Sequence, residues 1–234
     1  LRRSRRVSFG PAAGAGGLAL KYRYDLHIHS CLSPCGADDM TPASIAGFAK
    51  LNGLELAALT DHNSARNCAA FERAARAYGL ASLCGLELTT SEDIHVLCLF
   101  ETAAQAEACS DYVQQRIIRV KNRKDIFGGQ YVVDEDDKIR GEADYLLINA
   151  SEISFDSAAS LAESFGGVAV PAHVDKEANS AVSTLGAIAP ESGYMSYEFS
   201  DIRRREALMT SGAVPRGAFL VDSDAHTLDA IGIR

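Results

Sequence analysis

The sequence lacks several features that would place a protein in a membrane, secreted or repetitive class. No apolar run approaches the roughly 18 residues that a membrane-spanning helix needs. No secretory signal pattern is present, and no internal repeat is evident. We therefore expect a globular protein located in the cytoplasm, with no membrane partner.

Basic charge is scarce beyond the first part of the chain. Six of the 23 basic residues precede Asp25 and no acidic residue does, so 17 basic residues face all 31 acidic residues in the remainder, a balance of −14. Contacts to nucleic-acid phosphates need a basic face. We expect no stable nucleic-acid complex, whereas this charge is compatible with binding of divalent cations.

The six cysteines do not form a pattern typical of disulfides or of a structural zinc site. Four of them lie within helix-like or strand-like apolar runs: Cys68, Cys84, Cys98 and Cys109. A free thiol in such a run behaves as a small hydrophobic side chain. Cys31 and Cys35 have no second spaced pair that would complete a zinc site. The cysteines therefore indicate a reduced protein.

The chain divides into a leader and one domain. Residues 1–20 are basic and then rich in Gly and Ala, which is typical of a segment outside the fold. The remaining residues 21–234 have the length of a single α/β domain. We expect the leader to take no part in that domain.

Short apolar runs alternate with helix-like segments along the domain. The predicted strands are residues 21–28, 54–59, 81–86, 94–100, 168–172, 194–199 and 218–221. The predicted helices are residues 42–52, 64–78, 103–124, 154–165 and 201–211. The acidic run 134–137 is typical of the tip of a hairpin. Seven strand–helix units predict an α/β fold with a mainly parallel sheet, closed or nearly closed into a barrel.

Every histidine of the chain lies at a predicted strand end. His27 and His29 are two residues apart on a strand, so their side chains point to the same side. The residues at or just after the carboxyl ends of strands are His27, His29, Asp61, His62, Glu87, His173, Asp224 and His226. His95 is the exception, since it starts its strand. Carboxyl ends of barrel strands converge on one site, which predicts a functional cluster.

The chemistry of this set points to metal ions. Imidazole and carboxylate together suit Zn, Mn or Fe. A catalytic zinc takes about three protein ligands, so six imidazoles and three carboxylates exceed the needs of one ion. We predict two or three divalent ions, because a carboxylate such as Glu87 or Asp224 can bridge two of them.

The ordered motifs DLHIHS, TDHN, GLELTTSEDIHVLCLF, PAHVDK and DSDAHT resemble the PHP (polymerase and histidinol phosphatase) superfamily. The chain is most similar to its stand-alone metal-dependent phosphoesterases, and the resemblance covers about residues 22–230. It implies a distorted (β/α)7 TIM-like barrel of PHP type. It also implies a trinuclear site that hydrolyses phosphate esters.

The resemblance also assigns residue roles. It implies metal ligands at His27, His29, His62, Glu87, His95, His173, Asp224 and His226. Glu87 corresponds to the bridging glutamate, and Asp61 is either a ligand or a partner of one. Many members have an Asp or His five or six residues after the His-x-His pair, where this chain has Pro34 and Cys35. Asp39 is our predicted replacement, and Asp38 or Cys35 are the alternatives.

The predicted activity is hydrolysis of a small phosphate ester by a metal-activated water. The substrate would be nucleotide-like, or a sugar or amino-alcohol phosphate. We expect His62, His226 and Asp61 to act in catalysis, with His62 or His226 as candidate proton donors to the leaving oxygen. A 5′–3′ exonuclease or oligonucleotide phosphoesterase is the alternative, and short oligonucleotides are then the partners. A catalytically silent module and an amidohydrolase-type enzyme are less favoured.

Overall fold

A computed structural model describes residues 7–8 and 21–233, and all seven predicted strands form in it. They are β3 (Tyr24–Asp25), β4 (Leu56–Leu59), β5 (Ala81–Thr89), β6 (His95–Phe100), β9 (Val168–Pro171), β10 (Ser196–Glu198) and β11 (Ala218–Leu220). The five predicted helices also form, as α1 (Pro42–Leu51), α2 (Cys68–Ala77), α3 (Ala103–Gln114), α5 (Phe155–Ser164) and α7 (Ile202–Thr210). The α/β class is therefore confirmed.

Shorter elements complete the fold. They are the helices α4 (Lys124–Phe127) and α6 (Ala181–Leu185), the hairpin strands β7 (Tyr131–Val133) and β8 (Ile139–Glu142), and the 3-10 turns Pro190–Ser192 and Leu228–Ala230. The acidic run 134–137 connects β7 to β8, so the predicted hairpin tip is confirmed. No helix among the described residues has both the length and the apolar character required to cross a membrane.

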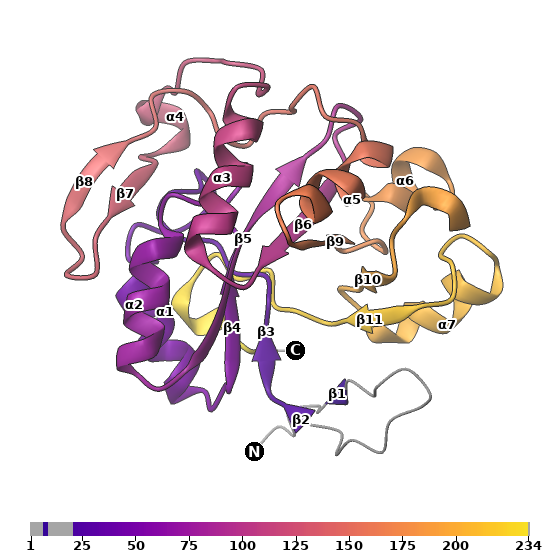
Figure 1. Cartoon of the computed structure of the whole chain (residues 1–234), viewed down its shortest axis with the longest axis horizontal. Coiled ribbons are helices and arrows are strands. Elements are labelled where there is room, and N and C mark those ends of the chain that lie inside the picture. Colours follow the sequence, from indigo (N-terminus) through magenta and orange to yellow (C-terminus); the bar gives the residue numbers. More distant parts are fainter. Residues whose placement is uncertain (1–6, 9–20, 234) are drawn as a thin grey trace.

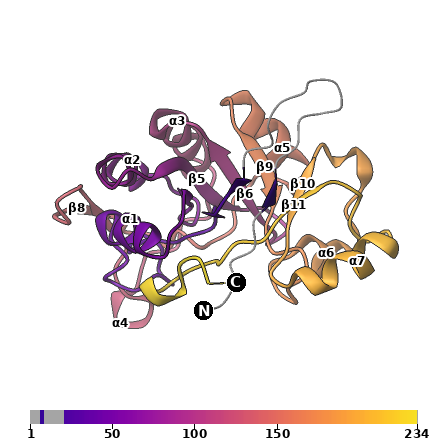
Figure 2. The same cartoon turned by 90° about the horizontal axis from the view of Figure 1, so that it is seen from below.

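The strands form a curled sheet in the order β3-β4-β5-β6-β9, beside a separate parallel pair, β10-β11 (Figures 1 and 2). β3, β4 and β5 are parallel, but β6 runs antiparallel to both of its neighbours. The five-residue connection 90–94 explains this direction, because a parallel return would need a crossover of a dozen or more residues. The predicted mainly parallel sheet is thus wrong at β6.

The two sheets meet at their carboxyl ends. Ile28, just after β3, and Ala225, just after β11, form an isolated parallel bridge. The amide of Val174, just after β9, donates to the carbonyl of Glu198 on β10. The arrangement is a curled half-barrel, and the fully closed seven-stranded barrel is not confirmed.

Both faces of the curled sheet are buried. On the outer face, α1, α2, α3 and α5 pack over side chains such as Leu86, Val96 and Phe100 (Figure 2). The inner face holds a second apolar cluster, made by Leu26, Ala58, Leu97, Leu99, Val170, Ala172 and Leu220. Because side chains alternate along a strand, His95 shares the inner face with Leu97 and Leu99. The inner apolar cluster therefore forms a floor below the polar residues.

Two helix boundaries differ from the prediction. α2 begins at Cys68 rather than at residue 64, because residues 63–67 form a loop whose Asn63 adopts a φ of 49°. α3 ends at Gln114, ten residues earlier than predicted. The following residues 117–121 are extended and pair with residues 145–151 through the bridges Ile117–Ser151 and Lys121–Tyr145. β-branched residues at 117, 118 and 120 favour this extended form.

The predicted leader, residues 1–20, lies outside the described residues except for β1 (Val7–Ser8). That pair of residues is antiparallel to β2 (Lys21–Tyr22). The predicted start of the first helix at residue 42 is confirmed, since Pro42 is the first helical residue and Thr41 Oγ1 accepts the amide of Ser44.

Candidate metal centre

Eight predicted ligands converge at one end of the curled sheet. His27 and His29 follow β3, His62 follows β4, and Glu87 lies within β5. His95 opens β6, His173 follows β9, and Asp224 and His226 follow β11. All except Asp224 and His226 are buried. His95 joins them because β6 is antiparallel, so that its first residue pairs with Thr89 near the carboxyl end of β5.

His27, His29 and Asp224 form the first candidate ion site. The Nε2 atoms of the two histidines lie 3.1 Å apart, and each is 3.3 Å from Asp224 Oδ1. Ligand atoms about 2.0–2.1 Å from a tetrahedral zinc would be separated by about 3.3–3.4 Å. The triangle therefore has the dimensions of three corners of such a site.

Glu87 lies between this triangle and the other histidines. Its Oε1 is 3.3 Å from His27 Nε2, 2.8 Å from His95 Nδ1 and 3.2 Å from His173 Nε2. Its Oε2 is 3.3 Å from His29 Nε2 and 3.1 Å from His62 Nδ1. Burial raises the pKa of Glu87, but His95, His27 and His62 outweigh it and hold that pKa well below its usual value. An ionised carboxylate with its two oxygens facing different histidines is suited to bridge two ions.

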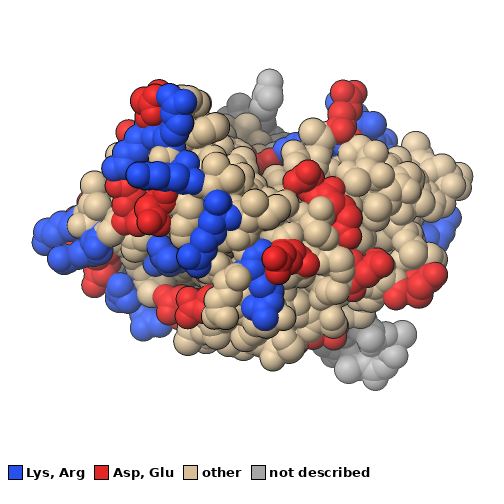
Figure 3. Space-filling view, turned by 90° about the horizontal axis from the view of Figure 1, so that it is seen from above, with Lys and Arg blue, Asp and Glu red and all other residues tan. Residues whose placement is uncertain are grey.

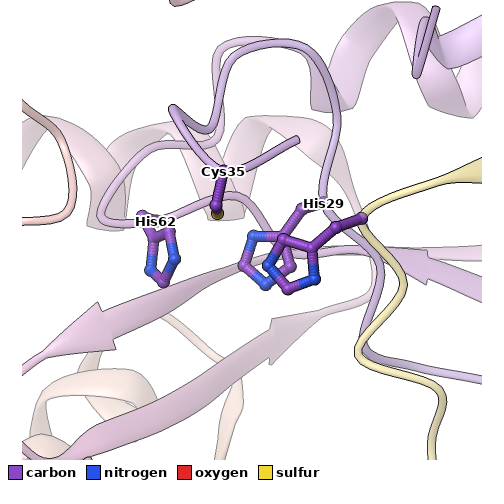
Figure 4. Close-up of side chains that lie close together, drawn as sticks. His29, Cys35 and His62 are labelled. Atoms are coloured by element: carbon purple, nitrogen blue, oxygen red, sulfur yellow. The ribbon is translucent and has the colours of Figure 1, made fainter. Parts of the chain in front are cut away.

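His62, Glu87 and His95 form a second group of ligand atoms, and His29, Cys35, His62 and His226 form a third. The atoms of each group lie within 4.8 Å of one another. Figure 4 shows the Cys35 sulfur pointing into the space beside the rings of His29 and His62. Asp39, the predicted ligand in this region, is exposed and belongs to none of these groups, and Asp38 is exposed as well. Of the three candidates in this loop, Cys35 is the one whose ligand atom lies among those of the histidines.

Two carboxylates, Glu198 and Asp61, belong to no ligand group of the described residues but support ligand histidines from behind. Glu198 faces His27 Nδ1 at 3.0 and 3.1 Å and accepts the backbone amide of His173 at 2.7 Å. A carboxylate on the outer nitrogen of a ligand histidine fixes its tautomer and orientation. The sequence prediction missed Glu198, although its place at the end of a strand was a usable signal.

Asp61 supports the site through hydroxyl groups. It accepts the amide and hydroxyl of Ser30 at 2.7 and 2.6 Å and the hydroxyl of Ser33 at 2.7 Å. Ser33 Oγ lies 3.0 Å from His29 Nδ1. Asp61 thus acts on His29 through Ser33, and no ligand group of the described residues includes it.

Opposite pKa shifts mark two stacked histidines, whose ring centroids are 4.4 Å apart. Burial lowers the pKa of His29, but hydrogen bonds to Asp224 and Glu87 outweigh it and raise that pKa to about 9. Burial and the neighbouring His29 lower the pKa of His226 to about 4. The carboxylates of Asp224 and Glu87 therefore favour the protonated form of His29. Burial and a protonated His29 oppose protonation of His226.

Two further observations fit a cation-binding centre. The Nδ1 atom of His173 is buried without a hydrogen-bond partner among the described residues, which native interiors rarely tolerate. His173 and Asp224 adopt positive φ values of 30° and 51°. Non-glycine residues in this region carry strain, and such strain concentrates at functional sites.

A cavity of about 350 Å³ opens over the cluster. Its floor includes His62, Glu87 and His173, and its wall is formed by Ile148 and residues 176–179. Lys176 is the one Lys or Arg among the residues that line it, and its ammonium group pairs with Asp224 Oδ2. The arrangement can hold several cations beneath a pocket that also carries one positive side chain.

The profile of the PHP domain family matches residues 25–170, more than half of the chain, and the chain belongs to this family. The predicted resemblance to the PHP superfamily is therefore confirmed. No curated protein has a significant sequence match to the chain.

Solved structures support the fold. An amidohydrolase from Chromobacterium violaceum, with bound sulfate and no metal, is 18% identical with a TM-score of 0.61, and 90% of each chain is covered. A provisionally named metal-dependent phosphoesterase from Bifidobacterium adolescentis is 16% identical with a TM-score of 0.58, and 87% of each chain is covered. Endonuclease Q from Pyrococcus furiosus is 18% identical with a TM-score of 0.60 over 88% of this chain, which spans 49% of that protein.

Proposed function

We propose that this protein hydrolyses a small phosphate ester, either nucleotide-like or a sugar or amino-alcohol phosphate. The observation that carries this proposal is the cluster of eight ligands beneath a cavity of about 350 Å³ with one lysine in its wall. A cavity of this size suits a small molecule. A metal-binding floor and a cationic wall suit a phosphate group.

Two or three Zn, Mn or Fe ions are part of the proposal, because imidazole and carboxylate donors fit these metals. When bound, such ions activate water and neutralise charge on a phosphate ester. His27, His29 and Asp224 would hold one ion, and Glu87 would connect it to a second held with His95. The distances between these ligand atoms, given above, support these roles.

The residues expected in catalysis receive more specific roles. His226 Nδ1 lies 2.7 Å from the carbonyl of Asp224, so it donates there and leaves Nε2 free to bind a cation. A nitrogen bound to a cation carries no proton, so we assign His62 and His226 as ligands rather than proton donors. Asp61 is a positioning residue, since it acts on His29 through Ser33.

Lys176 is the candidate phosphate-binding residue. Its partner Asp224 has one oxygen facing His27 and His29 and the other facing Lys176. A cation bound between Asp224 and the two histidines would weaken the hold of Asp224 on the lysine. The ammonium group would then be free to bind a substrate phosphate.

The single (β/α)7 domain of residues 21–234 also remains a proposal. Seven strands and the bridge between Ile28 and Ala225 support a distorted TIM-like barrel that closes at the ligand end.

Metal analysis combined with a phosphatase screen tests the proposed function. We expect two or three ions per chain by mass spectrometry, and phosphate release from mononucleotides or from sugar or amino-alcohol phosphates. Fewer than one ion per chain together with no hydrolysis would instead identify a catalytically silent module. Phosphate release from oligonucleotides alone would contradict the small-substrate proposal.

An oligonucleotide phosphoesterase is the second candidate, because one exposed segment is basic despite the acidic body. Residues 116–124 carry five basic side chains: Arg116, Arg119, Lys121, Arg123 and Lys124. Figure 3 shows Lys and Arg gathered on the side of the upper face that carries α4 and the β7–β8 hairpin. The segment pairs with residues 145–151, and Ile148 of that stretch lines the cavity.

Charge reversal distinguishes the two candidates. If a nucleic-acid strand lies along this segment, the double variant Arg119→Glu, Lys121→Glu should weaken binding of a single-stranded oligonucleotide and reduce its salt dependence. Hydrolysis of a mononucleotide should be unaffected. Fluorescence anisotropy at two salt concentrations measures the binding, and unchanged affinity would remove the second candidate.

A further inference from the structure

Cys35 occupies a fixed place in the loop that follows the first two ligands. The amide of Ser33 donates to the carbonyl of Ser30, and that of Gly36 to the carbonyl of Ser33, at 3.1 and 3.0 Å. The next amide, of Ala37, donates to the carbonyl of His226 at 2.9 Å. A Cβ atom on Gly36 would lie 2.2 Å from the Ser30 carbonyl oxygen, so the turn requires glycine. The loop therefore holds Cys35 against the segment that carries His226.

The thiol of Cys35 differs from every other thiol in the described part of the chain. The other five cysteines are buried, while Cys35 is exposed at the edge of the cavity. A ligand atom from each of His29, His62 and His226 lies within 4.8 Å of its sulfur. Cys35 is thus the exposed cysteine of this part of the chain, and its sulfur faces imidazoles.

One of these imidazoles is committed elsewhere. Ser33 occupies His29 Nδ1 at 3.0 Å, and His29 Nε2 lies close to His27 and Asp224. His29 Nε2 therefore belongs to the first ion site, and His29 is not counted as a ligand of an ion beside Cys35. Cys35, His62 and His226 remain as three donors with an open side toward the cavity, the number that a catalytic zinc takes from a protein.

We propose that Cys35, His62 and His226 form a zinc-selective site with a thiolate ligand, which we call the rim site. The proposal rests on the proposed function, since it concerns one ion of the same centre. The two other ligand groups contain a carboxylate and no sulfur, which suits Mn or Fe as well as Zn. Soft thiolate selects zinc over manganese and magnesium. The centre is therefore expected to hold ions of two kinds.

Protection of the thiol by metal provides a test that does not depend on activity. Metal-free protein is treated under native conditions with a maleimide, alone or with excess Zn²⁺, Mn²⁺ or Mg²⁺, and labelled sites are located by peptide mass spectrometry. Burial raises the pKa of the Cys35 thiol, so the reaction is run at alkaline pH. We expect Cys35 to be labelled in the metal-free protein and at least tenfold more slowly with Zn²⁺. Mn²⁺ and Mg²⁺ should leave the rate nearly unchanged.

Three variants sharpen the result. Cys35→Ser should lose one zinc ion per chain and retain the ions held around Glu87. Cys35→Asp should restore the ion count while removing the preference for zinc over manganese. Cys109→Ala, which removes a buried thiol on α3, is the matched control and should leave both metal content and Cys35 labelling unchanged. Far-ultraviolet circular dichroism verifies that each variant is folded.

A second readout reports the ligand directly. Cobalt substituted for zinc should show a sulfur-to-metal charge-transfer absorption in the wild-type protein that Cys35→Ser abolishes. Equal labelling rates with and without Zn²⁺ in a protein that holds two ions would overturn the rim site and leave the proposed function intact. A protein that binds no divalent ion at all would overturn both.

Discussion

The inner part and the rim of the metal centre are built differently. The inner ligands, such as His27 and Glu87, are 0–1% exposed and stand on or directly after strands, with Glu198 behind them. The rim consists of Lys176 together with the two loop residues of the rim site, Cys35 and His226. All three lie on loops and are partly or largely exposed. Backbone hydrogen bonds between loops position these rim residues.

This difference separates two contributions to function. Strand register and a buried second layer of carboxylates fix the inner ligands, so substitution there should remove metal and destabilise the site as a whole. Loop residues can change without disturbing the sheet, so the rim is where metal preference and substrate binding can vary. Substitutions in the two parts should therefore have separate effects on metal content and on substrate binding.

Substitution of Glu87 should produce the largest effect. Glu87→Ala removes a carboxylate whose two oxygens contact five histidines, so we expect metal content below one ion per chain and at least about a 100-fold loss of phosphate release. Mass spectrometry and a phosphate assay measure both. Glu101→Gln, an exposed acid just beyond β6, is the matched control. Normal metal content in Glu87→Ala would contradict the bridging role.

Substitution of Glu198 should have the next largest effect. Glu198→Gln removes the charge behind His27 while retaining the side chain's shape. Loss of such a partner typically reduces metal affinity by about 10–100-fold. Competition with a chromogenic chelator measures this affinity. If Glu198→Gln bound metal as tightly as the wild type, the inner ligands would not depend on their second layer.

Substitution of Lys176 should affect substrate binding and leave the metal in place. Lys176→Gln removes the cation that lines the cavity, and we expect KM to rise about tenfold, which corresponds to about 1.4 kcal/mol. Metal content should equal that of the wild type, since the rim lysine is no ligand. Lys50→Gln, which changes an exposed lysine on α1, is the control. Loss of metal in Lys176→Gln would show that metal binding depends on the rim as well as on the inner ligands.

Sequence alone could predict most of the inner part. His27 and His29 follow from the two-residue period of a strand, and the other ligands follow from their positions at strand ends. His95 does not follow this rule in a parallel sheet, because it lies at the start of its strand. The short connection 90–94 was the available signal, since five residues cannot hold a crossover helix.

The rim could not be predicted in the same way, because its residues are placed by loop geometry. Asp39 has the more usual ligand chemistry, but the two turns between Ser30 and Gly36 bring Cys35 to the site instead. The role of Asp61 is hidden for a related reason. Its position after β4 was predictable, whereas its direction depends on the hydroxyls of Ser30 and Ser33.

The dependence of stability on pH should separate an inner histidine from its rim neighbour. In the metal-free protein, the pKa of His29 is raised from its ordinary value of 6.5 to about 9, so its stabilising contribution is present below pH 6.5 and is lost as the pH rises toward 9. The pKa of His226 is lowered to about 4, so its contribution is lost as the pH falls from 6.5 toward 4. The two contributions together predict greatest stability near pH 6.5.

Thermal melts in chelator across pH 5 to 9 measure this profile. We expect each side to change the free energy of unfolding by on the order of 1 kcal/mol, since neighbouring groups in a coupled cluster compensate part of any one titration. His29→Asn should flatten the alkaline side and His226→Asn the acidic side. Metal should reverse the alkaline trend, because ligands must lose their protons to bind it. A metal-free profile that rises steadily to pH 9 would show that the acids around His29 do not hold its proton.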